Sequence, residues 1–257
     1  MLKKKIRKFI LLDFLLKKKS LMNIVKPKSI FSLLKENITF KVDTPSIEIG
    51  GLTLLESSIL VSLLKILKAK YIFEFGTYFG STTKLFSQNT MNSSKIYSID
   101  FDMKKHEPII SKSDVENQKY LHNGIINDQY LTYLLKKKGP YKIINKKKIL
   151  RKIKLLKLDS KLLDVRKLRF INKFDLIFID GGHDYQTVIS DTKNSLLMKK
   201  KDSIVVWHDY KSKIHSDVTK FLNNFNKKKK IFHIKNTMLV FALYGKYSKI
   251  KFKNEQY

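Results

Sequence analysis

The spacing of apolar residues along the chain predicts helices that alternate with strands. From residue 52 to residue 67 they recur every three or four positions, which is typical of a helix with one buried face. Residues 71–75 are apolar apart from one Glu and predict a buried strand. Further strands are predicted at residues 95–100, 153–158, 174–180 and 203–207, with a closing hairpin at residues 230–234 and 238–243.

The intervening segments contain the expected helices. Residues 185–197 carry an apolar stripe at helical spacing, and residues 214–225 are expected to form a later helix. This alternation predicts an α/β fold with a doubly wound, mostly parallel seven-stranded sheet and helices on both faces. Ligands in such sheets bind beyond the carboxyl ends of the strands, so functional residues are expected there.

Three parts of the chain differ in composition. Residues 1–50 are predicted to form an N-terminal basic helical extension and connector, in which Pro27 and Pro45 act as breakers. Residues 51–245 are predicted to form one domain, with an insertion at about residues 103–150 that is longer than a crossover needs. Residues 246–257 are a predicted basic C-terminal tail.

The charge of the chain narrows its expected partners. The 257 residues have a formal net charge of +31, which is compatible with a nucleic-acid partner. However, only four of the 53 basic residues are Arg, and the Lys runs are scattered, so a nucleic-acid partner is an alternative that we do not favour. The absence of Cys excludes disulfides, thiolate nucleophiles and Cys-based zinc sites, and a cytoplasmic location is expected.

The first 20 residues combine basic residues with a short apolar run. Asp13 interrupts the run, no small-residue cleavage site follows, and the run is far shorter than the roughly 20 residues that span a bilayer. We expect a basic amphipathic helix here. Peripheral contact of residues 1–20 with the inner membrane surface and packing against the chain's own domain are alternative roles for it.

A glycine-bearing turn follows the first predicted strand. Gly76 and Gly80 allow the backbone to turn sharply and to approach a ligand closely. A dinucleotide-binding fingerprint would need a glycine where Tyr78 stands. Asp100 ends the next strand, 20 residues beyond Gly80, where a carboxylate can accept both ribose hydroxyl hydrogens. Asp102 is the alternative residue for this role.

Two further groups of polar residues follow predicted strands. Asp180-Gly181-Gly182-His183 comes after the strand at residues 174–180, and His208-Asp209 comes after the strand at residues 203–207. With the acidic Glu74 two residues before Gly76, these motifs resemble class I S-adenosylmethionine-dependent methyltransferases. The subgroup with Asp-Gly-x-His includes small-molecule and sugar O-methyltransferases. The resemblance covers about residues 50–245, but not the first 45 residues or the insertion at residues 103–150.

The resemblance implies a Rossmann-like fold and S-adenosylmethionine as cofactor. It also implies which residues bind this cofactor: Glu74, Phe75, Gly76, Thr77, Gly80, Ser81, Asp100, Asp159 and Asp180. In the resembling fold the fourth and fifth strands are adjacent, so Asp180 and the His208-Asp209 pair are expected to converge.

The chemistry of methyl transfer assigns roles to the converging residues. A hydroxyl acceptor must lose a proton, and a base or a metal ion assists this step. The predicted catalytic residues are Asp180, His183 and His208, and the predicted ligands of Mg²⁺ or another divalent ion are Asp180, His208 and Asp209. Helix capping by His183 and Asp184 is the alternative interpretation. His106, His122, His215 and His233 have no motif around them and are expected to be surface or packing residues.

The leading hypothesis is O-methylation of a small-molecule or glycan hydroxyl. An RNA-directed methyltransferase is an alternative, although the Asp/Asn-Pro-Pro-aromatic motif of base-methylating enzymes is missing after residue 180. A third hypothesis is a non-catalytic methyltransferase-like module that binds an anionic surface. The intact Glu74, Gly76, Gly80 and Asp100 argue against it.

Overall fold

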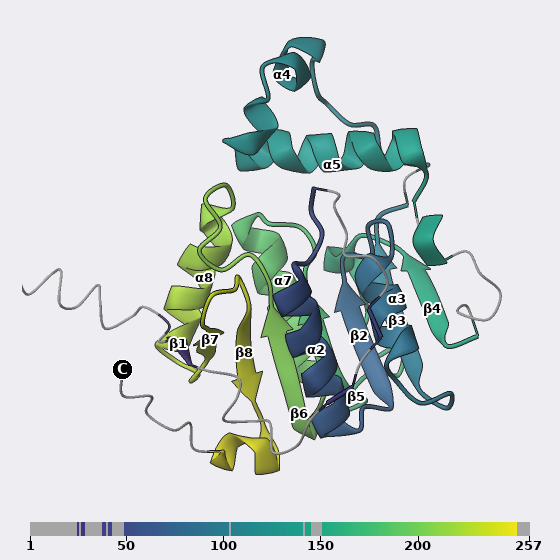
Figure 1. Cartoon of the computed structure of the whole chain (residues 1–257), viewed down its shortest axis with the longest axis vertical. Helices are drawn as coiled ribbons and strands as arrows, with labels where there is room; N and C mark the ends of the chain where they lie inside the picture. Colours follow the sequence, from purple (N-terminus) through teal and green to yellow (C-terminus); the bar gives the residue numbers. More distant parts are fainter. Residues whose placement is uncertain are drawn as a thin grey trace, which may run out of the picture.

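The computed structural model describes residues 25, 27–28, 38–39, 41–42, 49–102, 104–140, 142–144 and 151–250. In this part of the chain one mixed sheet lies between two layers of helices, and a helical segment crosses one end of it (Figure 1). The amphipathic helix expected at residues 1–20 and residues 251–257 of the predicted tail lie outside the described residues. None of the described helices is long and apolar enough to cross a membrane.

The sheet has the order β1-β7-β8-β6-β5-β2-β3-β4. Neighbouring strands from β6 to β4 in this order run parallel, whereas β8 runs antiparallel to both β6 and β7. The predicted fold class is confirmed, and all seven predicted strands are present. The strands are β1 (Pro27–Lys28), β2 (Tyr71–Phe75), β3 (Lys95–Asp100), β4 (Ile153–Lys157), β5 (Phe174–Ile179), β6 (Lys199–Trp207), β7 (Phe232–Ile234) and β8 (Val240–Leu243).

The short strand β1 is an addition to the predicted sheet. It lies in the segment expected to be a helical extension and connector, and it pairs in parallel with β7 at the edge of the sheet. Pro27 was expected only to break structure. At a sheet edge one side of the strand has no partner, so the missing N–H of proline need not remove a ladder hydrogen bond.

Two layers of helices cover the sheet because side chains alternate along each strand. Helices α2 (Leu54–Leu67) and α3 (Ser81–Gln88) pack on one face, where Ile72 of β2 lies. Helices α7 (Tyr185–Met198) and α8 (Ser216–Asn226) pack on the other face, where Phe73 and Phe75 lie. Short 3-10 helices follow β4 and β8 as η4 (Ser160–Leu162) and η5 (Gly245–Lys249).

The first turn of α2 has a capping box. The Thr53 side chain accepts a hydrogen bond from the Glu56 N–H, and Glu56 Oε2 accepts one from the Thr53 N–H at 3.0 Å. Glu56 is only 1% exposed. This cap fixes a buried carboxylate at the N-terminal turn of α2.

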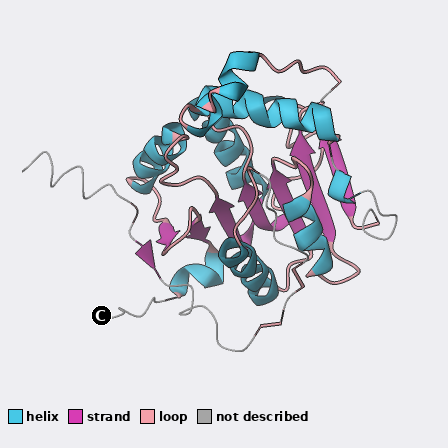
Figure 2. Cartoon of the chain, turned by 45° about the horizontal axis from the view of Figure 1, so that its top comes forward, coloured by secondary structure: helices cyan, strands magenta, loops and turns pink. Residues whose placement is uncertain are grey.

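The insertion forms a roof over the carboxyl ends of the strands. It contains α4 (Lys112–Glu116), η2 (Lys119–Leu121), α5 (Gly124–Lys138) and η3 (Lys142–Ile144). The Asn123 side chain caps α5 by accepting the Ile126 N–H at 3.1 Å, and Gly139 with φ 86° follows its last turn. Figures 1 and 2 show α5 lying across the end of the sheet where the loops of the fold gather.

Candidate active site

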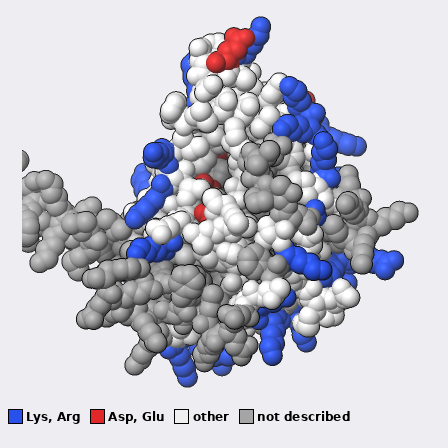
Figure 3. Space-filling view, in the orientation of Figure 1, with Lys and Arg blue, Asp and Glu red and all other residues white. Residues whose placement is uncertain are grey.

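A cavity of about 570 Å³ lies between the carboxyl ends of the central strands and the roof. Its lining includes Asn127, Asp128 and Leu131 of α5. Figure 3 shows acidic atoms at the bottom of the hollow below the roof, whereas Lys and Arg side chains are spread around the outside of this face. Most of the predicted site residues line the cavity: Phe75, Gly76, Thr77, Ser81, Asp100, Asp180, His183, His208 and Asp209.

Gly76 is required where β2 meets the glycine turn. Its φ is +87°, and a Cβ atom at this position would lie 1.8 Å from the carbonyl oxygen of Asp180. The Asp180 N–H also donates to the carbonyl of Phe75 at 2.9 Å. Because no side chain intervenes, the predicted cofactor loop packs directly on the backbone of a predicted catalytic residue.

Gly80 closes the same turn and serves as the N-cap of α3. It has φ +88°, and a Cβ atom at this position would lie 3.0 Å from the side chain of Ile144 in the insertion. Gly80 itself does not line the cavity, whereas Ser81 and Thr82 of the first turn of α3 do.

Asp100 lies at the end of β3 and lines the cavity. Its Oδ2 accepts the Tyr78 N–H at 2.6 Å, and its Oδ1 accepts the Phe101 N–H at 2.8 Å. Burial raises the pKa of this carboxyl, while the hydrogen bonds from Tyr78, Phe101 and Thr77 favour the charged form. Each oxygen keeps further lone pairs, so the carboxylate holds the glycine turn and can still accept ligand hydroxyls.

Glu74 lies beneath the turn and does not line the cavity. It is fully buried, and its Oε2 accepts hydrogen bonds from Thr83 Oγ1 and, at 2.6 Å, from Ser98 Oγ. Ser98 Oγ also lies 2.6 Å from Thr77 Oγ1 in the turn. Burial raises the pKa of Glu74 to about 8 against the effect of these hydroxyls. Glu74 therefore supports the turn from below, whereas the sequence predicted a residue that binds the cofactor.

Asp159 follows β4 and is turned towards its own backbone. Its side chain accepts the Lys161 N–H at 2.9 Å and caps η4. The cavity at this strand is lined by Leu158, Ser160 and Lys161. Asp159 was predicted to bind the cofactor, but the cavity surface here comes from its two neighbours and Lys161.

His208 lies among three carboxylates. Its Nδ1 is 3.1 Å from Asp180 Oδ1 and 3.2 Å from Asp209 Oδ2, and its Nε2 is 3.4 Å from Glu56 Oε1. Burial disfavours the charged imidazole, but Asp180 and Asp209 hold the pKa of His208 well above its usual value. Burial raises the pKa of Glu56, yet the contact with His208 and two backbone hydrogen bonds bring it down to about 2.

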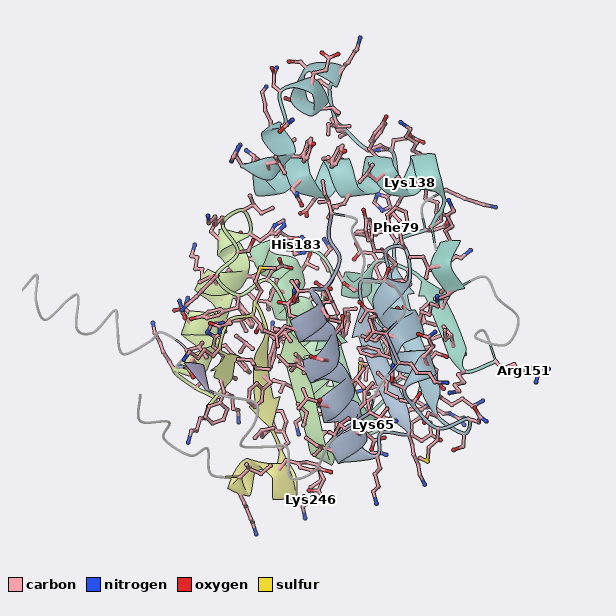
Figure 4. The ribbon with its side chains drawn as sticks, in the orientation of Figure 1. Lys65, Phe79, Lys138, Arg151, His183 and Lys246 are labelled. Atoms are coloured by element: carbon pink, nitrogen blue, oxygen red, sulfur yellow. The ribbon has the colours of Figure 1, made fainter. Side chains whose placement is uncertain are left out.

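His183 joins this cluster to the roof. Its Nε2 is 3.1 Å from Asp209 Oδ2, and its Nδ1 is 2.7 Å from Asp128 Oδ1 of α5. Figure 4 shows the labelled His183 below α5, at the same end of the sheet. Against the effect of burial, Asp209 and Asp128 hold the pKa of His183 well above the usual range. Asp184 caps α7 through the Gln186 and Thr187 N–H groups, so the capping interpretation applies to Asp184.

Asp209 connects the two imidazoles. It is 8% exposed and has a left-handed φ of 60°, an uncommon conformation for a residue other than glycine. Burial would raise its pKa, but His208 and His183 hold it well below the usual value. The backbone at Asp209 therefore adopts an unfavoured conformation while its carboxylate contacts both rings.

Two sets of three side chains in the described residues could each hold a metal ion. They are Asp180, His183 and Asp209, and Asp128, His183 and His215, with the donor atoms of each set within 4.8 Å of one another. The first set contains both carboxylates that the sequence predicted as ligands. It has His183 in place of the predicted His208, and His208 contacts the same two carboxylates.

A sequence-family model described as a methyltransferase domain matches residues 73–210, which is more than half of the chain. The chain belongs to this methyltransferase family. No curated protein sequence matches the chain.

Solved structures with a similar fold also include methyltransferases. One is an O-methyltransferase from Bacillus cereus in complex with SAH, with TM-score 0.47 and 11% identity over 77% of this chain and 84% of that chain. Another is an SAH-bound methyltransferase from Podospora anserina, with TM-score 0.48 and 13% identity over 76% of this chain and 80% of that chain. A third is the O-methyltransferase TomG from Streptomyces achromogenes, involved in tomaymycin synthesis and in complex with SAM, with TM-score 0.44 and 12% identity over 76% and 82% of the two chains.

Sequence reasoning did not assign three residues of this cluster to the candidate site. His215 was expected to be a surface or packing residue; it is buried at 6% exposure and packs on His183 with ring centroids 3.8 Å apart. Asp128 and Glu56 reach the site from α5 and α2. No motif surrounds Asp128 or His215, whereas Glu56 was visible only as part of a capping box.

Proposed function

We propose that this methyltransferase transfers a methyl group from S-adenosylmethionine to the hydroxyl oxygen of a small molecule or glycan. The observation that carries the proposal is that the glycine turn of β2 and the Asp-His cluster line the same cavity. The carbonyl of Asp180 lies against Gly76, so a molecule over the turn would lie next to the cluster. The cavity volume of about 570 Å³ is also in the range of small-molecule sites.

The residues over β2 and β3 fit the cofactor. Gly76 has a positive φ and its missing side chain leaves room for the Asp180 carbonyl, while Thr77, Tyr78 and Phe79 of the same turn line the cavity. Asp100 offers carboxylate lone pairs to the ribose hydroxyls, while Glu74, Ser98 and Thr83 hold the turn from below. When bound, S-adenosylmethionine supplies a methyl group on a sulfonium centre, which is strongly electrophilic.

The residues over β5 and β6 would prepare the acceptor. We assign to His183 the removal of the hydroxyl proton as the oxygen attacks the methyl carbon and the carbon–sulfur bond breaks. Asp128 and Asp209 contact the two ring nitrogens, fix the ring's orientation and hold the pKa of His183 above its usual range. To act as the base, the ring must first lose one proton, and its Nε2 must turn from Asp209 to the acceptor hydroxyl, whose proton it then takes.

The oxygen-rich part of the cluster also fits a divalent ion. Asp180, Asp209 and His183 offer two carboxylates and one imidazole within 4.8 Å of one another, a donor set that suits Mg²⁺ or Mn²⁺. Such an ion would lower the pKa of an acceptor hydroxyl that it bound. We therefore include a divalent ion in the proposal, held by these residues.

The test is transfer of a radioactive methyl group from labelled S-adenosylmethionine to separate pools of small molecules, glycans and RNA. We expect label in a small-molecule or glycan product as an O-methyl ether. His183→Asn should lower the rate by about 10²- to 10⁴-fold. The control His122→Asn removes an exposed imidazole from the insertion that forms the roof, and it should leave the rate unchanged. Label in RNA alone, or equal rates for the two variants, would contradict the proposal.

A further inference from the structure

The rings of His183 and His215 bring nitrogen ligands together at the roof of the cavity. Their centroids are 3.8 Å apart with an angle of 24° between the planes. His215 directly precedes α8, and His183 lies in the loop between β5 and α7. Asp128 of α5 completes the group, and one donor atom from each of the three lies within 4.8 Å of the others. Three separate elements of the fold therefore meet at one point.

We propose that Asp128, His183 and His215 form a binding site for a transition-metal ion such as Zn²⁺ or Co²⁺. Two imidazoles and one carboxylate suit these borderline ions, whereas the neighbouring set with two carboxylates suits Mg²⁺ better. The site differs from the divalent site of the proposed function because Asp128 and His215 take the places of Asp180 and Asp209.

The present geometry requires small side-chain movements to bind an ion. Zinc bonds to nitrogen and carboxylate oxygen are about 2.0–2.2 Å long, so tetrahedral ligands lie about 3.4 Å apart. Asp128 Oδ1 and His183 Nδ1 are 2.7 Å apart and would have to separate slightly to admit the ion. The donor atoms of the whole set already lie within 4.8 Å of one another, so rotations of the His215 and Asp128 side chains can adjust the other separations. All three residues line the cavity, which gives the ion a path of entry.

Each of the two imidazoles can offer a ring-nitrogen lone pair to a metal ion, and binding would displace the proton from a ring nitrogen that carries one. An ion at this site would tie α5 to the loops before α7 and α8, and it would hold the ring nitrogen of His183 that now contacts Asp128.

The test is titration of the full chain with Co²⁺ alone, followed by calorimetry and by visible d–d absorption, whose intensity reports low-symmetry coordination. Wild type should bind one ion at this site and gain thermal stability on binding. His215→Ala and the larger His215→Gln should weaken binding at least about tenfold. The control His122→Ala removes an exposed imidazole from the insertion that contains Asp128, and it should bind Co²⁺ as tightly as wild type does.

Circular dichroism and titration with S-adenosylhomocysteine keep the result interpretable. They show whether each variant is folded and whether the cofactor site of the proposed function is intact. Failure of wild type to take up Co²⁺ would overturn the metal site even if S-adenosylhomocysteine binds. The proposed metal site would also be overturned if both His215 variants bound Co²⁺ as tightly as wild type. The same conclusion would follow if Asp180→Asn abolished Co²⁺ uptake while His215→Ala did not.

Discussion

Replacing Gly76 by Ala tests the close contact between the glycine turn and Asp180. The new Cβ would lie 1.8 Å from the Asp180 carbonyl oxygen and 2.6 Å from its carbonyl carbon. Both are backbone atoms, so neither can rotate away as the end of a flexible side chain could. The turn or the loop after β5 would have to move.

Gly139 provides the matched control. Its φ is +86°, almost the same as the +87° of Gly76, but nothing lies within 4 Å of the position of its Cβ. Ala in such a conformation costs about 1–3 kcal/mol at either position. Overpacking adds about 1–3 kcal/mol or more at Gly76 alone. We expect Gly76→Ala to lower the free energy of unfolding by about 2–6 kcal/mol, and Gly139→Ala by about 1–3 kcal/mol.

Urea unfolding followed by circular dichroism measures both free energies, and calorimetry measures the affinity for S-adenosylhomocysteine. Gly76→Ala should also weaken this affinity at least tenfold, because the turn and Asp180 are displaced together. Gly139→Ala should leave it unchanged. Equal losses of stability in the two variants, with unchanged affinity in both, would refute the close packing described here.

Three further substitutions test the buried polar groups. Glu74, with its pKa of about 8, keeps a proton in the folded state that it loses near pH 4.5 in the unfolded state, so wild type loses stability as pH rises between these values. In urea titrations, the free energy of unfolding of Glu74→Gln should therefore rise relative to that of wild type by roughly 1.4 kcal/mol per pH unit from pH 5.5 to 7.5, and parallel curves would contradict this. Glu56→Gln leaves His208 without one charged buried partner, so it should lower the free energy of unfolding by about 3–5 kcal/mol. The exposed control Glu116→Gln should lower it by less than about 0.5 kcal/mol, and similar values for the two variants would argue against the buried pair. Asp128→Asn should lower kcat for methyl transfer at least tenfold while the affinity for S-adenosylhomocysteine stays within about twofold. Glu116→Gln, an exposed carboxylate on the same insertion, is the control, and a change in affinity alone would remove Asp128 from the acceptor side.

The fold and the strand-end residues could be predicted because local patterns determine them. Apolar runs of strand length located the seven strands, and residues after the carboxyl ends of parallel strands meet at one edge. This placed Gly76, Asp100, Asp180 and His208 correctly at the cavity or beside it. The same reasoning could not distinguish a residue that faces the cavity from one that faces the core. Glu74 stands only two positions before Gly76 and yet is fully buried under the turn.

The roof and its contacts could not be predicted from local patterns. Asp128 contacts His183 across 55 positions of sequence, and nothing near either residue encodes that distance. His215 reaches the site because the chain after β6 turns back before α8, with left-handed φ angles at Asp209 and Lys211. Such turns usually favour glycine or asparagine, but Asp209 and Lys211 occupy these positions, so the sequence did not indicate a turn here.

The central claim is that the cavity binds S-adenosylmethionine with its ribose at Asp100. Calorimetric titration with S-adenosylhomocysteine tests it most directly, with Asp100→Asn compared against wild type and against Asp102→Asn, whose side chain accepts the Lys104 N–H instead of lining the cavity. We predict one micromolar site in wild type and in Asp102→Asn, weakened about 10- to 100-fold in Asp100→Asn by loss of hydrogen bonds to a charged group. Absence of binding by folded wild type, or equal affinity in all three proteins, would contradict it.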